Sequence, residues 1–197
     1  MPRLARTLLL TAVALGLVVP SAGAAAPGRL LGNMWTTVLE TPTGENPFVT
    51  GEAACVEVGS NTVAPFSPTP QDFTCTVRRG TKVFVAAGSW ECSSFPGDHF
   101  DFGTTEGDLR ECAALHDDLD IRSVTVDGQS VTITPIETGL LTIHLPEDNI
   151  FGLEGADRSG TSVAHGRGVL LKHLAPGTHT IDIDIAGSVI TTTIIVT

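Results

Sequence analysis

Hydrophobic and polar positions alternate most regularly near the end of the sequence. Ile181, Ile183 and Ile185 are separated by single aspartates, which predicts a strand with one apolar face and one charged face. Residues 186–188 supply a turn, and the run 189–196 is almost wholly β-branched, which suits a pleated strand better than a helix. The pattern therefore predicts a hairpin that buries its isoleucine face.

Shorter runs of the same kind predict further strands. These runs are 35–39, 55–58, 73–77, 82–86, 124–126, 131–133, 141–145 and 169–174. Asp127-Gly128 separates two of them and is a strong hairpin signal. Residues 78–81 likewise predict a hairpin that joins 73–77 to 82–86.

Three segments rich in turn-forming residues predict irregular structure. The segment 59–71 contains three prolines and is expected to be a surface loop. The segment 93–103 combines Gly, Pro and Asp with aromatic residues, and 146–168 is the longest irregular stretch of the second half.

One helix is predicted after residue 105. The Thr105 hydroxyl can accept a hydrogen bond from an early backbone amide, and the acids that follow favour the positive end of a helix. The residues that recur at helical spacing on one face are Leu109, Cys112, Ala113 and His116.

The four cysteines are Cys55, Cys75, Cys92 and Cys112. An even number in an exported chain predicts disulfides, and three pairings are possible. We expect Cys55 to pair with Cys75 and Cys92 with Cys112, because pairing in sequence order closes two local loops of similar size. Zinc is not expected, since its sites use cysteines much closer together in the sequence.

The first residues have the features of a secretory signal peptide. Arg3 and Arg6 precede an apolar run over 8–19, and small residues follow it. We predict a signal peptide over 1–24, with Ala26 as the alternative cleavage point, and a secreted protein in the extracellular space or periplasm. No later stretch approaches 18 apolar residues, so no membrane span is expected.

The remainder, residues 25–197, is expected to form a single domain of mainly β structure. About nine or ten short strands with turns between them predict an antiparallel β-sandwich with one short helix and two disulfides. The formal charge of the whole chain is −11. The charged residues of the predicted signal peptide are all basic, so its removal makes the protein more acidic. Such a surface is repelled by phosphate backbones, so nucleic acid is not an expected partner.

Several short stretches of the sequence belong together: Trp35, Asn46-Pro47, the four cysteines, Val126-Asp127-Gly128, residues 145–149 and residues 174–181. In these stretches the chain resembles small secreted bacterial β-sandwich proteins of immunoglobulin-like or jelly-roll-like type. The resemblance implies fold and export. It carries over no site residue.

Candidate chemistry is sparse. No Gly-x-Ser-x-Gly motif is present, and with all cysteines assigned to bridges no catalytic residue is predicted. Acidic groups at 116–120 and 147–157 could hold calcium, but the first departs from the EF-hand pattern, and we expect solvated loops and no metal or cofactor. His179 shares the phase of the isoleucines, so we expect it to point inward and to bond a carbonyl group.

The candidate binding residues are Trp90, Asp98, Asp101 and Phe102, because aromatic rings beside acids can hold a sugar. The expected function is a non-catalytic binding or interaction module whose extracellular ligand is a glycan or a protein. The alternative is a secreted hydrolase that uses two of its own carboxylate side chains to cleave an extracellular polysaccharide. A cleft with two convergent acids would favour the hydrolase.

Overall fold

The computed structural model describes residues 27–96, 101–172 and 174–197. The predicted signal peptide and Asp98 lie outside these residues. Within them the protein is mainly β, with two sheets and three α-helices. No helix among these residues is long and apolar enough to cross a membrane.

The larger sheet has six strands. Five follow the order β1-β2-β4-β9-β7, and β8 also pairs with β9. Their bounds are β1 (Ala54–Gly59), β2 (Thr62–Phe66), β4 (Lys82–Ser93), β7 (Thr134–Glu137), β8 (Leu141–His144) and β9 (Ser159–Leu171).

The second sheet has five strands in the order β3-β11-β10-β5-β6. Their bounds are β3 (Phe73–Val77), β5 (Ile121–Val126), β6 (Gln129–Ser130), β10 (Gly177–Ile185) and β11 (Ser188–Val196). The predicted C-terminal hairpin is confirmed, since β10 and β11 pair antiparallel from end to end. The turn predicted at Asp127-Gly128 is confirmed as well, since it joins β5 to β6, but β6 is only Gln129–Ser130 and the strand predicted at 131–133 is wrong.

Both sheets are mixed, so the prediction of purely antiparallel structure is wrong. β2 pairs parallel with β4, and β3 pairs parallel with β11. The hairpin predicted for 73–77 and 82–86 is also wrong, although both strands exist. Residues 78–81 carry the chain from one sheet to the other instead of folding it back on itself.

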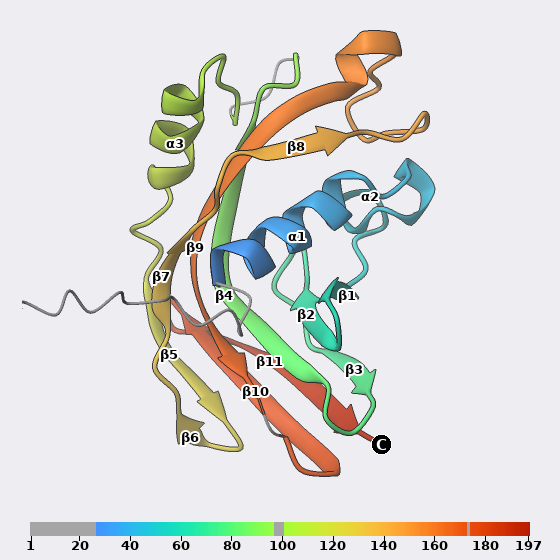
Figure 1. Ribbon diagram of the computed structural model, residues 1–197. Coiled ribbons are helices and arrows are strands. Elements are labelled where there is room, and N and C mark those ends of the chain that lie inside the picture. Colours follow the sequence, from blue (N-terminus) through green and yellow to red (C-terminus); the bar gives the residue numbers. More distant parts are fainter. Residues whose placement is uncertain (1–26, 97–100, 173) are drawn as a thin grey trace, which may run out of the picture.

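The described residues form three α-helices, of which only α3 was predicted: α1 (Pro27–Leu39), α2 (Pro47–Thr50) and α3 (Glu106–Ala114). The strand predicted at 35–39 is wrong, because these residues end α1. Short 3-10 turns, η1 (Thr43–Glu45) and η2 (Gly155–Arg158), complete the helical elements described. α1 lies on one side of β4 and β9, and α3 lies on the other (Figure 1).

Two predicted irregular segments contain strands. β2 lies within 59–71, where its parallel pairing with β4 ends at Val63, two residues before Pro65. β9 begins at Ser159, ten residues before the strand predicted at 169–174.

The helix at α3 and both disulfides are confirmed. The Thr105 hydroxyl accepts a hydrogen bond from the Asp108 amide, in a capping box. Cys92–Cys112 links β4 to α3, and Cys55–Cys75 links β1 to β3 and so joins the two sheets.

Candidate functional site

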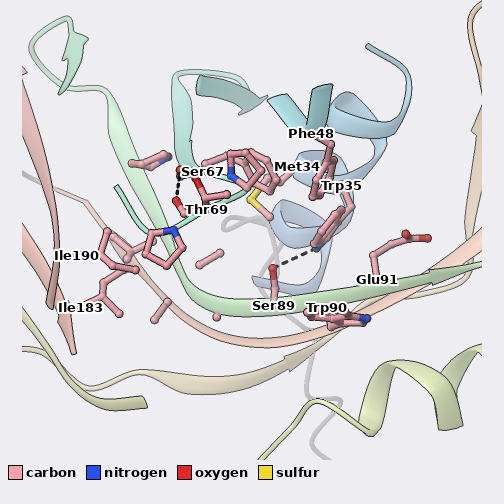
Figure 2. A pocket seen from close by; sticks show the side chains of 18 of the residues that line it. Met34, Trp35, Phe48, Ser67, Thr69, Ser89, Trp90, Glu91, Ile183 and Ile190 are labelled. Carbon is pink, nitrogen blue, oxygen red and sulfur yellow. Dashed lines mark hydrogen bonds between the residues drawn. The ribbon is translucent and has the colours of Figure 1, made fainter. Parts of the chain in front are cut away.

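A cavity of about 440 Å³ lies beside β4. Side chains from α1, α2, β2, β4, β10 and β11 line it, together with the proline-containing segment 67–70. Figure 2 shows Ile183 and Ile190 at one end and Trp35 and Glu91 toward the other. Most of the lining is apolar, and it contains no Lys, Arg or His.

The apolar end is built by the C-terminal hairpin. The period of two places Ile181, Ile183 and Ile185 on one face of β10, and all three line the cavity with Ile190 of β11. Ile181 is fully buried, whereas Ile183 is only half-buried because the cavity lies beside it. The intervening aspartates belong to the opposite face.

Three aromatic rings form the wall opposite β4. Phe48 of α2 stacks on Trp35 with ring centroids 6.1 Å apart, and Phe66 meets both rings edge-on at 5.7 Å. The buried Asn46 holds α2 in place: its side chain accepts from the Phe48 amide and donates to the Val38 carbonyl of α1 at 2.7 Å. Phe48 remains 48% exposed, so this wall reaches the protein surface.

The polar groups of the cavity lie mainly on β4. The Trp35 indole donates to the Ser89 hydroxyl at 3.2 Å, as Figure 2 shows. Two residues further on, Glu91 is only 9% exposed, and the Ser162 hydroxyl of β9 donates to its carboxyl group. Burial raises the pKa of Glu91 from 4.5 to about 8, against the effect of the Ser162 bond, and the nearby Asp101 charge adds to the rise. The carboxyl group is therefore mostly protonated at neutral pH.

Glu91 was not a candidate of the sequence analysis. It is the one acid in the strand 82–93, and a single carboxylate there would be read as a solvent-facing residue. Its burial follows from α1, which covers this face of β4 and which the sequence analysis did not predict.

The structure brings together part of the predicted binding patch. The Trp90 indole donates to the Asp101 carboxylate at 2.7 Å, and the His116 ring stacks on Trp90 at 3.8 Å. Phe102 is 41% exposed and its backbone pairs with Ser93. Asp98, the fourth predicted residue, lies outside the described residues.

Trp90 and Glu91 point to opposite sides of β4, as neighbours on a strand do (Figure 2). Trp90 faces α3 through its stacking on His116, although Trp90 and Asp101 also border the cavity. Glu91 faces the side of α1. Asp101 is not a strand residue: it lies in the segment whose carbonyl accepts the Ser93 amide hydrogen bond, and its charge is near enough to Glu91 to raise the pKa of that group.

Three residues of the acidic segments that could hold calcium make other contacts. Asp117 lies 3.2 Å from the His165 ring, and Asp120 pairs with Arg122 at 3.0 Å. In the other segment, the Asn149 amide bonds backbone groups of its own loop. Among the described residues, one group has metal-ligand spacing: Asp101 with Cys92 and Cys112, and that pair forms a disulfide without a thiolate to offer.

The carbonyl bond predicted for His179 is confirmed, but the side chain is only partly buried and does not belong to the core. Its Nε2 is 2.8 Å from the Ala175 carbonyl, and its Nδ1 is 2.7 Å from the Asp127 carboxylate. The carboxylate raises the pKa of His179, and the imidazole lowers the pKa of Asp127. The pair fixes the β5–β6 turn against β10, which is a structural role.

No family model matches this chain, and no curated protein matches it. Among solved structures, the chain is similar to the solution structure of Amebosin at 9% sequence identity, over 66% of this chain and 100% of that chain. The TM-score is 0.24, so this similarity carries no argument about fold or function.

Proposed function

We propose that this protein is a non-catalytic binding protein that holds an apolar ligand in the cavity beside β4. The observation that carries the proposal is the cavity itself, about 440 Å³ of mainly apolar lining. Pockets for small ligands have volumes of roughly 300–1,000 Å³, with apolar walls and few polar groups. We also propose that the predicted signal peptide exports the protein and that its two sheets are arranged as a sandwich.

The construction of the cavity supports this function. Its walls come from segments far apart in the sequence, α1, β4 and the C-terminal hairpin, so it depends on the complete fold. The half-buried isoleucines expose apolar surface that a ligand would cover, at roughly 25 cal/mol for each Å² removed from water.

The alternative, a carboxylate-dependent hydrolase, has less support. Such an enzyme needs two carboxyl groups that converge on one bond. Glu91 and Trp90 point to opposite sides of β4 (Figure 2), and Asp101 is bonded to Trp90, although both acids line the cavity. Asp101 also accepts the Trp90 indole hydrogen bond, which occupies one of its oxygens.

Two adjacent residues of β11 provide the test. Ile190 lines the cavity, whereas Val189 is 60% exposed and lies outside the lining. Ile190→Trp should fill part of the cavity and raise the Kd for the uncharged fluorescent dye N-phenyl-1-naphthylamine at least tenfold. Val189→Trp adds the same side chain to the same strand and should leave the Kd unchanged.

Fluorescence titration of the three proteins measures these affinities, and circular dichroism verifies that each variant is folded. The proposal is rejected if the unmodified protein does not bind the dye, or if both variants bind it as the unmodified protein does.

A further inference from the structure

β4 has a free edge inside the cavity. β2 pairs with β4 only through Thr62–Lys82 and Val63–Val83, and then continues to Phe66 along β1. β9 pairs with one edge of β4. Along the other edge, no strand among the described residues pairs with β4 beyond Val83, and the next backbone hydrogen bond is the one from the Ser93 amide to the Asp101 carbonyl. The cavity lies along this gap.

The lining shows that the cavity meets β4 edge-on. Successive side chains of a strand point to opposite faces, so a cavity on one face would be lined by every second residue. Here all seven consecutive residues from Val85 to Glu91 line the cavity. The backbone of β4, and not one of its faces, therefore forms the wall.

The phase of the backbone amides can be read from the hydrogen bonds at both ends of the gap. The Lys82 amide donates to the Asn61 carbonyl and the Ser93 amide donates to the Asp101 carbonyl, both away from β9. A register shift between Ala86 and Gly88 inserts one extra residue into β4. Before the shift the even-numbered amides point away from β9, and after it the odd-numbered amides do. The backbone groups of Ala86, Ser89 and Glu91 accordingly face the gap, and no partner for them is found among the described residues.

Unpaired backbone groups at the edge of a sheet are a template for another strand, and leaving them unpaired in apolar surroundings is costly. An extended peptide can satisfy them through main-chain hydrogen bonds while its side chains enter the pockets on both sides. The lining contains no cation, and Asp101 borders it, so an acidic segment would be repelled.

We propose that the ligand is an extended, uncharged peptide segment that adds as a strand to the free edge of β4 at Ala86–Glu91. The apolar side chains of the segment lie between the isoleucines of the C-terminal hairpin and the aromatic wall of Trp35, Phe48 and Phe66. This assignment rests on the proposed binding function of the cavity and specifies the class of its ligand.

The test uses three acetylated and amidated hexapeptides, (Thr-Val)₃, (Thr-Leu)₃ and (Thr-Phe)₃, which compete with N-phenyl-1-naphthylamine for the same protein as in the dye titration. At least one should displace the dye. That peptide is then made with N-methyl groups on its odd amides or on its even amides. Methyl groups on the amides that face β4 should weaken binding at least tenfold, and methyl groups in the other phase should weaken it less than threefold.

Amide hydrogen exchange provides a second measurement that needs no variant. Peptide binding should slow exchange at Ala86, Ser89 and Glu91 at least tenfold, because these amides become hydrogen-bonded. The Val189 amide, on the exposed outer end of β11, serves as the control and should be unaffected.

The outcomes separate the two proposals. If the dye binds, and Ile190→Trp weakens it, but no peptide displaces it, then the strand-addition assignment is wrong while the binding function stands. The assignment is also wrong if both N-methylated peptides bind equally well, or if the three amides stay unprotected. If the dye itself does not bind, the binding function fails and the assignment fails with it.

Discussion

Glu91→Gln should make the protein more stable, and the gain should grow with pH. A glutamine has the shape of a protonated glutamate and can still accept the Ser162 hydrogen bond. Below pH 4.5 the wild-type carboxyl is protonated in both the folded and the unfolded chain, so the substitution should change little. Between 4.5 and about 8 the unfolded chain releases this proton while the folded chain keeps it, and wild-type stability falls.

The magnitude follows from the raised pKa. A difference from 4.5 to about 8 corresponds to a penalty on the order of 5 kcal/mol above pH 8, at about 1.36 kcal/mol for each unit. Small domains are stable by about 5–15 kcal/mol, so the wild type should lose a large part of its stability by pH 9. The variant escapes this penalty because it has no proton to release.

Urea denaturation at pH 4, 6, 8 and 9, with the disulfides intact, measures the difference in unfolding free energy between the two proteins. Glu57→Gln, at an exposed position on β1, controls for the loss of one negative charge. A difference between wild type and Glu91→Gln that stays constant from pH 4 to pH 9 would refute the buried protonated carboxyl.

Three further predictions concern the rest of the molecule. Replacing Cys92 and Cys112 together by serine should cost about 3 kcal/mol and speed hydrogen exchange in α3 more than in β10 and β11, as NMR can measure. Asp127→Asn should lower the pKa of His179 in an NMR titration. Because that pKa is raised in the folded state, the stability that the pair contributes at acidic pH should be lost as pH rises through it. Melting temperatures in chelator and in millimolar calcium should agree, since a bound ion would raise stability; a shift of several degrees would overturn this.

The parts of the fold that could be predicted are those fixed by local patterns. The isoleucine alternation of β10, the Asp127-Gly128 turn and the Thr105 cap each depend on residues close together in the sequence. Pairing of the cysteines in sequence order also succeeded, because each bridge spans only 20 residues.

The errors have physical causes. The apolar residues of α1 recur at helical spacing over 30–38, but the segment 35–39 alone is too short to show it. The segment 159–168 was expected to be irregular because of its glycines. In β9, Gly168 permits close approach: a Cβ there would lie 2.4 Å from the Val85 carbonyl oxygen.

The cavity could not be predicted because its walls meet only in the folded chain. Trp90 and Asp101, grouped in the sequence analysis because aromatic and acidic residues cluster there, are in contact in the structure. Glu91 acquires its role from α1 and from Ser162, which lies 71 residues away. β4 has a free edge because its parallel pairing with β2 stops at Val63. The local sequence pattern does not predict where such a pairing ends.

β11 lies between β3 and β10, although β3 is made much earlier in synthesis. Phe73 pairs with Thr192, so β3 has no partner in its own sheet until the last strand has been made. Contacts between such distant segments form slowly, because a long loop must close first. The Cys55–Cys75 bridge can hold β3 beside β1 during this delay. The cavity is therefore completed late, only when β10 and β11 arrive with the isoleucine wall.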